Sequence, residues 1–585
     1  MKKITGARIV IETLINEKVN VIFGYPGGAV LPIYDELFKQ KKLRHILVRH
    51  EQAAVHAAEG YARSTGKVGV VLVTSGPGAT NTVTGLTDAM MDSVPVVCIS
   101  GQVPTHMIGN DAFQEADIVG ITRPCTKHNY LVKDINKLAE TIHSAFYISK
   151  NGRPGPVLVD IPKDIQTFKT SYSGKKLSNK LSFYKPKTKP NDDEVDKAIQ
   201  LLKVSKKPIF YVGGGVVNSG SNASNELFKL IKKTGFPCTQ TLMGLGSFPT
   251  SDQQFIGMLG MHGTYEANLS MHQSDLLICV GARFDDRITG KVSGFSPNSK
   301  KIHMDIDPSS FNKSVNVDLT IQGDLFKILK KINEKIVQKK IRFKKSNIEK
   351  WWKQISTWRS RKCLTYKNSD SIIKPQFALE RLNDLTKKYN PFITTEVGQH
   401  QMWAAQFLTF NKPKHWMTSG GLGTMGYGLP AAMGVQIAHP KSLVIDVAGE
   451  ASILMNIQEL STIKQYRLPV KIFILNNHYM GMVKQWQELL HGNRLSESYM
   501  DSLPDFVKLA ESFGAYGIQV IKPGDVDDAI REMIKIKGPV ICDVVVDPNE
   551  NCFPMIPSGS THNEMLLGPN DKLEGEISEE GMILV

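Results

Sequence analysis

The chain has 585 residues, a length that predicts three or four domains rather than one. Its apolar content of 41% and charged content of 22% are typical of a globular protein, and no window offers the ~18 uninterrupted apolar residues of a membrane span. The excess behind the net charge of +15 lies mainly in lysine-rich stretches such as 339–345, where Phe343 is the only aromatic residue, so we expect a solvated surface and no nucleic-acid partner.

The N-terminus and the cysteines indicate the compartment. Met1-Lys2-Lys3 leads directly into an amphipathic helix predicted over Ala7–Asn16, which leaves no room for a signal or transit peptide. The seven cysteines are scattered and form no Cys-x-x-Cys pair, which indicates reduced structural thiols rather than a zinc or redox site. We therefore expect a cytoplasmic protein.

One pattern recurs along the chain: a short apolar run, a glycine-rich turn and an amphipathic helix. This alternation predicts parallel sheets with helical crossovers, and hence an α/β fold of three Rossmann-like doubly wound units. The predicted strands are Val19–Phe23, Val68–Thr74, Val94–Ser100 and Pro156–Ile161 in the first unit, Pro208–Val212, Asp275–Val280 and Lys301–Ile306 in the second, and Phe392–Glu396, Ser442–Val447, Val470–Leu475 and Val540–Val546 in the third.

These elements define the predicted domains. They lie at residues 1–168, 192–341 and 375–548, with a polar linker at 169–191 and a lysine- and tryptophan-bearing connector at 342–374. The turn-rich tail, 549–585, is expected to pack over a site or an interface.

Glu51 is the first candidate for chemistry. It stands in the string Arg49–Gly66, where an apolar run ends and an alanine-rich helix is predicted over Ala53–Ser64. The structural alternative is that the acid simply favours the helix N-terminus.

The stretch from Gly449 to Asn477 is the second candidate. Gly449-Glu450-Ala451 follows one predicted strand and Asn476-Asn477 ends the next, so the two strand ends should converge at the carboxyl edge of a sheet. A carboxylate and an amide oxygen suit Mg²⁺, and the helix predicted at 453–466 directs its free amides at a phosphate. The alternative is an acid that compensates the helix dipole beside an Asn-Asn turn.

Taken together and in order, the motifs of residues 6–557 resemble the acetolactate (acetohydroxyacid) synthase family of thiamine-diphosphate enzymes. Single glycine-rich pieces are weak evidence, because turns require glycine anyway. The matching segments are Gly24–Ala29, Arg49–Gly66, Gly76–Asn81, Ala112–Glu115, Pro162–Asp164, Gly398–His400, Gly421–Pro430, Gly449–Asn477 and Met482–Gln487. The resemblance implies an N-terminal pyrimidine-binding domain, a central FAD-binding domain and a C-terminal diphosphate- and metal-binding domain.

The resemblance also implies the residues that hold thiamine diphosphate and Mg²⁺. Glu51 would hydrogen-bond the aminopyrimidine ring, and Met425 would support the bent shape of the cofactor. The other implied cofactor contacts are Pro77, Asn81, Val397, Gly398, Gln399, His400, Gly423, Gly449, Ala451, Ser452 and Asn477. The implied metal ligands are Glu450, Asn477 and the backbone carbonyl of Tyr479.

Five further residues are implied at the substrate side of the active site. They are Gly28, Phe113, Gln114, Lys163 and Trp486, and Trp486 would narrow the pocket for a 2-keto acid of preferred size. A cation such as Lys163 suits carboxylate substrates. Taken alone, Trp486 is also explained as a core aromatic and Lys163 as a surface cation.

The second unit is expected to bind FAD. Glycines follow the predicted strand Pro208–Val212, although not in the GxGxxG pattern, so a nucleotide-free Rossmann unit is the alternative. The resemblance implies FAD in a structural rather than a redox role. The implied contacts are Arg153, Gly213, Gly214, Gly215, Met261, His262, Gly263, Thr264, Gly281, Ala282, Arg283, Asp285, Arg287, Met304, Asp305, Ile306, Gly323 and Asp324.

The chain departs from the family at the metal motif, where Gly-Asp-Gly is replaced by Gly449-Glu450-Ala451. The extra methylene of Glu450 displaces the carboxylate by about 1.5 Å, whereas Mg²⁺ requires near-ideal octahedral geometry. Ala451 either adds a β-carbon close to the phosphate or stands where a positive φ is needed. Weakened metal affinity is the prediction.

The reaction implied by the resemblance joins two pyruvates to 2-acetolactate, or pyruvate to 2-oxobutanoate, with release of CO₂, and begins branched-chain amino-acid synthesis. A homodimer is implied, with Glu51 of one chain opposite Glu450 and Asn477 of the other, together with a small regulatory subunit. Two alternatives stay open. One is another thiamine-dependent keto-acid decarboxylase or oxidase, against which Trp486, Lys163 and the string Arg283–Arg287 argue. The other is a catalytically weakened family member, which positions 450 and 451 favour.

Overall fold

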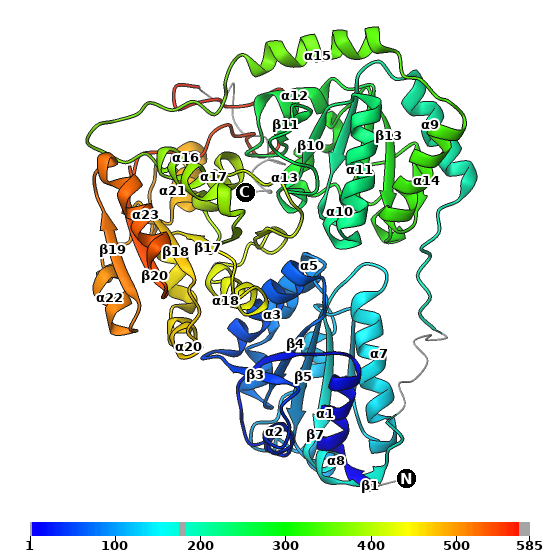
Figure 1. Cartoon of the computed structure of the whole chain (residues 1–585), viewed down its shortest axis with the longest axis vertical. Helices are drawn as coiled ribbons and strands as arrows, with labels where there is room; N and C mark the ends of the chain where they lie inside the picture. The colour runs from blue at the N-terminus through cyan, green and yellow to red at the C-terminus, as the bar shows by residue number, and fades with distance from the viewer. Residues whose placement is uncertain (1–2, 175–182, 572–585) are drawn as a thin grey trace.

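The computed structural model describes residues 3–174 and 183–571. Within them the chain forms three units, each built on a six-stranded parallel sheet covered by helices, so the predicted α/β class is confirmed. Figure 1 shows the N-terminal unit in blue and cyan, the central unit in green and the C-terminal unit in yellow and orange.

The N-terminal sheet has the strand order β3-β2-β4-β5-β7-β6. Its strands are β2 (Val21–Gly24), β3 (Arg44–Leu47), β4 (Gly69–Val73), β5 (Val96–Gln102), β6 (His128–Leu131) and β7 (Val157–Pro162). Its helices are α1 (Gly6–Asn16), α2 (Leu31–Phe38), α3 (Glu51–Thr65), α4 (Pro77–Thr80), α5 (Val83–Met91), α6 (Ile118–Thr122), α7 (Leu138–Lys150) and α8 (Lys163–Thr167). A separate antiparallel pair joins β1 (Lys3–Thr5) to β8 (Lys169–Ser171), so the start of the predicted linker lies beside the start of the chain.

The central sheet has the order β11-β10-β9-β12-β13-β14. Its strands are β9 (Pro208–Val212), β10 (Cys238–Gln240), β11 (Phe255–Met258), β12 (Leu276–Val280), β13 (Lys300–Asp305) and β14 (Leu319–Gln322). Its helices are α9 (Asp192–Val204), α10 (Gly214–Ser219), α11 (Ser221–Thr234), α12 (Tyr265–His272), α13 (Asp286–Thr289) and α14 (Leu325–Gln338). The predicted connector contains a further helix, α15 (Lys345–Arg359), which buries Trp351 against this unit. The indole N–H of Trp351 donates to the carbonyl of Pro208 at 3.0 Å.

The C-terminal sheet has the order β16-β15-β17-β18-β20-β19. Its strands are β15 (Phe392–Thr395), β16 (Trp416–Met417), β17 (Val444–Ala448), β18 (Lys471–Asn476), β19 (Tyr516–Val520) and β20 (Val540–Val545). Its helices are α16 (Pro375–Thr386), α17 (Gln399–Phe407), α18 (Gly428–Ala438), α19 (Glu450–Ile453), α20 (Glu459–Gln465), α21 (Gly481–Leu490), α22 (Phe506–Ser512) and α23 (Val526–Lys535).

The predicted strands all exist, with ends within two residues of the prediction, because each is a short apolar run buried on both faces. The single helix predicted at 453–466 is wrong. The chain there forms α19, a 3₁₀ turn over Leu454–Asn456, and then α20. The side-chain amide of Asn456, at the turn, donates to the carbonyl of Gly426 at 2.7 Å, a long-range bond that no local pattern indicates.

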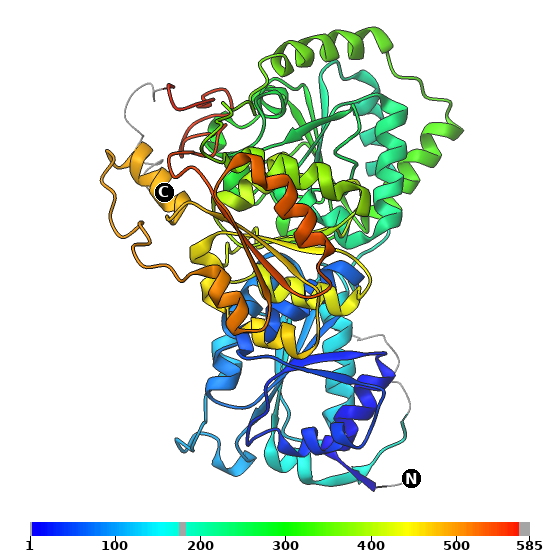
Figure 2. The same cartoon turned by 60° about the vertical axis from the view of Figure 1, so that its left-hand side comes forward.

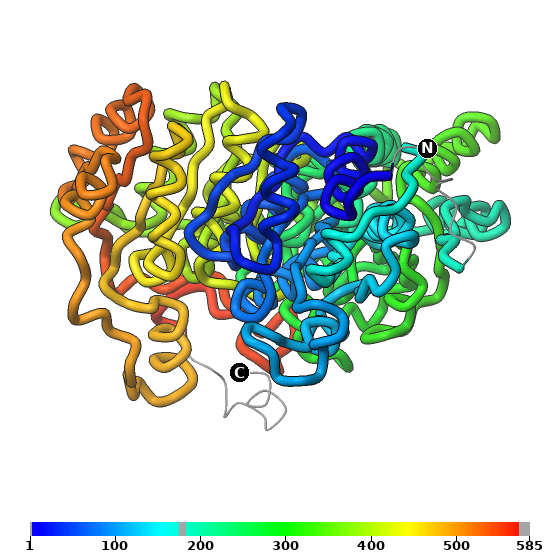
Figure 3. Tube along the Cα trace, turned by 90° about the horizontal axis from the view of Figure 1, so that it is seen from below, coloured from blue at the N-terminus to red at the C-terminus, as the bar shows by residue number. Residues whose placement is uncertain are grey.

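The N-terminal and C-terminal units share one apolar core, in which α3 packs on α18. Their blue and yellow segments lie side by side when the molecule is viewed from below (Figure 3). The described part of the tail, red in Figures 1 and 2, runs between the C-terminal and central units. There the N–H of Ile556 bonds to the carbonyl of Met261. No helix within the described residues is both long and apolar enough to span a bilayer.

Candidate active site

A cavity of about 810 Å³ lies between the central and C-terminal units, and the end of α5 closes one side of it. Residues predicted at the thiamine diphosphate and the metal line it together: Val397, Gly398, Gln399, His400, Gly423, Met425, Gly449, Glu450, Ala451, Ser452, Asn477 and Tyr479. Trp486, predicted at the substrate side, lines it as well. Most of the residues predicted at FAD line the same cavity: Arg153, Gly213, Gly214, Gly215, Met261, His262, Gly281, Ala282, Arg283, Asp285, Arg287, Asp305, Ile306 and Asp324. The remaining four, Gly263, Thr264, Met304 and Gly323, are not part of its lining.

Glu450 and Asn477 meet because their strands are neighbours. β17 and β18 pair in parallel, with Ala448 opposite Ile474, so Glu450 and Asn477 follow the same edge of the sheet. Glu450 is 1% exposed, and its Oε1 has no hydrogen-bond partner within the described residues. Burial raises the pKa of its carboxyl to about 7, although the backbone N–H groups of Glu450, Tyr479 and Asn477 act against this rise. A buried carboxylate oxygen without a partner, beside an amide oxygen and a carbonyl, is a donor set that fits Mg²⁺.

Glycine at position 449 leaves room for the imidazole of His400. A β-carbon at Gly449 would lie 2.7 Å from Nδ1 of His400. Ala451 lies inside α19 and has no positive φ, so the expectation of a left-handed backbone there is wrong. The methyl group of Ala451 still stands in the lining of the cavity.

His400 offers a neutral polar group to the same end of the cavity. Burial lowers the pKa of its imidazole to about 3, and Nε2 has no hydrogen-bond partner within residues 3–174 and 183–571. Neutral imidazole can donate from one ring nitrogen and accept at the other. Together with the first turns of α17 and α19, this group fits an anionic ligand such as a diphosphate.

At the other end of the cavity, glycines allow β9 and β12 to approach each other. A β-carbon at Gly213 would lie 2.3 Å from the carbonyl oxygen of Gly281, and the N–H of Gly215 bonds to that oxygen at 2.9 Å. Gly281 has φ +65°, a conformation that disfavours other residues. Asp305 ends β13, where burial raises the pKa of its carboxyl to about 6. Backbone concavities and carboxylates at strand ends suit a nucleotide.

The cavity is narrowed by a contact between two units. The guanidinium of Arg287, in the central unit, lies 5.5 Å from the ring centre of Trp486, in α21. The indole nitrogen of Trp486 is buried and has no hydrogen-bond partner in the described part of the chain. Such a cation–π pair leaves a flat, cationic wall facing the cavity.

The remaining predicted residues form a second group in the N-terminal unit, away from the cavity lining: Gly28, Glu51, Pro77, Asn81, Phe113, Gln114 and Lys163. Glu51 begins α3, and its Oε2 accepts from the side-chain amide of Asn81 at 3.0 Å. Phe113 is 88% exposed, and a β-carbon at Gly28 would meet no atom within 4 Å. Within one chain, Glu51 therefore lies outside the lining of the cavity that Glu450 faces.

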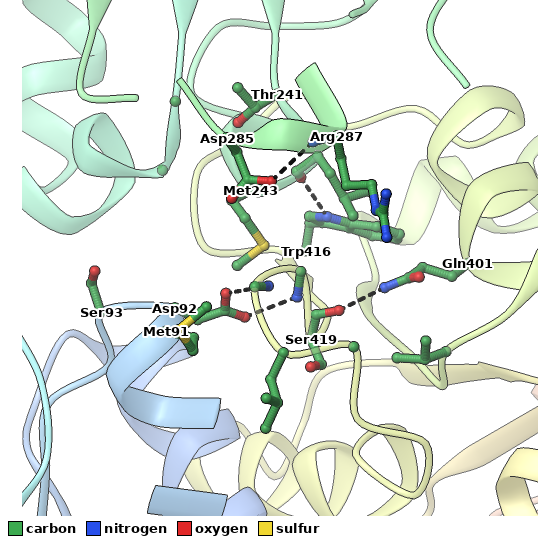
Figure 4. Close-up of a pocket in the computed structure, with 18 of the residues that line it drawn as sticks. Met91, Asp92, Ser93, Thr241, Met243, Asp285, Arg287, Gln401, Trp416 and Ser419 are labelled. Carbon is green, nitrogen blue, oxygen red and sulfur yellow. Dashed lines mark hydrogen bonds between the residues drawn. The ribbon is translucent and has the colours of Figure 1, made fainter. Parts of the chain in front are cut away.

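Two buried acids at and near the end of α5 were not found from the sequence. The carboxylate of Asp92 accepts from the N–H groups of Gly420 and Gly421, at 3.0 and 2.7 Å (Figure 4). Asp88 accepts from the hydroxyls of Ser419 and Thr424. These bonds hold the loop that contains Gly423 and Met425. Acids in an amphipathic helix have no local signal that marks them as buried.

The comparisons with known proteins extend over the whole molecule. Models of the N-terminal, central and C-terminal domains of thiamine pyrophosphate enzymes match residues 4–121, 195–332 and 396–544. The acetolactate synthase large subunit of Haemophilus influenzae is 49% identical over 97% of this chain and 99% of its own length. The isozyme 3 large subunit of Escherichia coli is 48% identical over 98% of this chain and 100% of its own length. The large subunit of Cyanidium caldarium is 46% identical over 96% of each chain.

Sequence motifs, fold and full-length similarity agree, and the predicted family is confirmed. The chain belongs to the thiamine pyrophosphate (thiamine diphosphate) enzyme family, among the acetolactate synthase large subunits.

Proposed function

We propose that this chain is the catalytic subunit of an acetolactate synthase. It joins two pyruvates to 2-acetolactate, or pyruvate to 2-oxobutanoate, and releases one CO₂, the first common step of valine, leucine and isoleucine synthesis. The observation that carries the proposal is the buried Glu450 carboxylate, with an unpartnered oxygen at the cavity wall beside Asn477 and Tyr479, in a chain of this family.

Thiamine diphosphate, when bound, would supply a carbon nucleophile for the keto acid and a ring that takes up the electron pair released on decarboxylation. The chain's part is to hold and orient it. His400 and the first turns of α17 and α19 would bind the diphosphate, and Glu450, Asn477 and the carbonyl of Tyr479 would hold Mg²⁺. Glu51 would hold a proton at the aminopyrimidine ring.

FAD would occupy the central end of the cavity. The backbone N–H groups of the glycines that follow β9 and β12 would donate to its phosphates, and Asp305 would accept from its hydroxyls, with the flavin in a structural role. This assignment makes residues 192–341 the flavin domain, between the two thiamine-binding domains at 1–168 and 375–548. Residues 169–191, 342–374 and 549–585 are then the linker, the connector and the tail.

The active form would be a homodimer, because one chain separates Glu51 from Glu450. In a two-fold dimer, Glu51, Gly28, Gln114 and the exposed Phe113 of one subunit would complete the cavity of the other. Lys163 would face the carboxylates of the keto acids. A small regulatory subunit would be a further partner.

Product analysis tests the reaction. With pyruvate, Mg²⁺, thiamine diphosphate and FAD, acetolactate is the expected main product. Acetaldehyde or acetate as the main product would instead support a decarboxylase or an oxidase.

A Mg²⁺ titration tests the altered metal motif. The double variant Glu450→Asp/Ala451→Gly is expected to reach half-maximal activity at about tenfold lower Mg²⁺ than the wild type, a difference of about 1.4 kcal/mol. Equal Mg²⁺ requirements, with full wild-type activity, would remove the alternative of a catalytically weakened family member.

A further inference from the structure

A line of buried amides connects the tail to Asn477. Gln485 lies in α21, is fully buried, and contacts the backbone of Cys552 with both ends of its amide. The N–H of Cys552 donates to Oε1 of Gln485 at 2.7 Å, and Nε2 of Gln485 donates to the carbonyl of Cys552 at 3.1 Å. Since a backbone N–H can only donate and a carbonyl can only accept, this pair permits one orientation of the Gln485 amide.

The orientation of the Gln485 amide determines that of the next two amides, Gln399 and Asn477. Oε1 of Gln485 also accepts from Nε2 of Gln399 at 2.8 Å, so Oε1 of Gln399 points the other way. There it accepts from Nδ2 of Asn477 at 3.2 Å. Asn477 must then turn its Oδ1 to the opposite side, where the oxygen accepts from the N–H of Tyr479 at 3.1 Å.

We infer that Gln485 is a positioning residue for the metal site, and that with the backbone of Cys552 it fixes which end of the Asn477 amide faces the cation. The inference rests on the Mg²⁺ site of the proposed function. An Asn477 amide turned by half a rotation would present two N–H donors in place of a ligand oxygen, and a cation repels those donors. Nothing in the proposed reaction requires Gln485 to touch substrate or cofactor.

Substitutions at position 485 can distinguish an orienting role of Gln485 from a role in packing. Gln485→Met keeps the volume but removes both amide ends, so the Gln399 amide loses its closest acceptor, at 2.8 Å, and retains two acceptors at 3.4 Å, the carbonyl of Glu550 and Oδ1 of Asn551. Gln485→Glu keeps an acceptor for Gln399 and for the N–H of Cys552, and in its protonated form it also keeps a donor for the carbonyl of Cys552, so it preserves the direction of the line. Gln487→Met is the matched control, because it makes the same substitution in the same helix outside the line.

The measurement is thiamine diphosphate binding as a function of Mg²⁺ concentration, in the absence of substrate. Quenching of tryptophan fluorescence reports the binding. In Gln485→Met the half-saturating Mg²⁺ concentration is expected to rise about 10- to 100-fold, the usual effect of losing a group that orients a metal ligand. Gln485→Glu and Gln487→Met are expected to stay within about threefold of the wild type. Thermal unfolding of each protein without ligands checks that the fold is intact.

A second variant keeps the test informative if Gln485→Met does not fold. The side chain of Gln485→Asn is one methylene shorter and cannot contact both Cys552 and Gln399. This variant should therefore lower the Mg²⁺ affinity as Gln485→Met does. In Asn477→Asp the two side-chain oxygens are equivalent, so the direction of an amide no longer matters. In this background, adding Gln485→Met should alter the Mg²⁺ affinity by less than about threefold.

Two outcomes would overturn the inference. One is wild-type Mg²⁺ affinity in Gln485→Met, and the other is equal weakening in Gln485→Met and Gln485→Glu. A wild type that binds thiamine diphosphate without any need of Mg²⁺ would instead refute the metal site of the proposed function, and the inference with it. The two failures are therefore distinguishable.

Discussion

Single buried carboxylates join the units of this molecule, and Glu459 is one of them. It lies at the start of α20 in the C-terminal unit, where its Oε1 accepts from the N–H groups of Arg49 and His50 at 2.8 and 3.0 Å. Its Oε2 accepts from the hydroxyl of Thr462. These contacts fix the backbone just before Glu51. Burial raises the pKa of the Glu459 carboxyl to about 7, although its hydrogen bonds act against this rise.

Replacing Glu459 should change how stability depends on pH. A carboxyl whose pKa rises from 4.5 to about 7 on folding contributes stability that is complete below pH 4.5 and lost as pH rises through about 7. We expect the free energy of unfolding of the wild type to fall relative to Glu459→Gln over this range, by about 1.4 kcal/mol per pH unit at most. Glutamine keeps the acceptor for both N–H groups.

Denaturant unfolding at pH 5, 6, 7 and 8 measures this difference. The exposed Glu511→Gln is the control, and its profile should run parallel to that of the wild type. If the profile of Glu459→Gln also ran parallel to that of the wild type, burial would not raise the pKa of the Glu459 carboxyl.

Among the elements, the pair α3 and α18 sets how closely the N-terminal and C-terminal units approach. A β-carbon at Gly434 would lie 1.9 Å from the carbonyl oxygen of Ala57, and one at Gly60 would lie 2.2 Å from that of Ala431. Each glycine therefore allows the backbone of the other helix to come into contact. Because Glu51 begins α3, this contact also places the carboxylate that we propose to be catalytic.

Gly434→Ala is expected to destabilise the protein by about 1–3 kcal/mol, because the helices must separate to admit the methyl group. Gly524→Ala, where a β-carbon would meet no atom within 4 Å, is the control and should unfold with the wild type. Chemical denaturation checks both variants. An unchanged midpoint for Gly434→Ala would mean that the helices can move apart without cost.

The elements also show what could be predicted from sequence. Strands were found because a run such as Val444–Ala448 is buried on both faces and ends at a turn signal. The meeting of Glu450 and Asn477 was predicted because strand ends converge in parallel sheets. The break at Asn456 and the roles of Asp88, Asp92 and Gln485 could not be predicted, since each depends on a partner far along the chain.

At the scale of the whole molecule, the predicted site residues form two groups that one chain keeps apart. Glu450, Asn477 and His400 line the cavity, whereas Glu51 and Phe113 do not. No pattern in the sequence could show this separation, because it depends on how the units are placed. Family resemblance alone predicted that two chains would be needed.

Complementation between subunits tests that arrangement. Glu51→Gln should lower kcat by about 10²- to 10⁴-fold through loss of the proton-holding group, and Glu450→Gln should weaken Mg²⁺-dependent cofactor binding. A purified heterodimer of the two variants has one intact site and one doubly altered site, so about half of the wild-type activity is expected. The assay uses co-expressed, differently tagged chains. Activity no higher than that of the single variants would mean that both groups act within one chain.

The pairing of β1 with β8 has a mechanical consequence. Residues 3–5 and 169–171 pair with each other, so the two ends of the N-terminal unit lie side by side. Non-covalent contacts such as α3 on α18 hold the unit against the C-terminal unit. Joining its two ends by a short loop, and opening the chain elsewhere on the unit's surface, should therefore leave the unit docked in the same place.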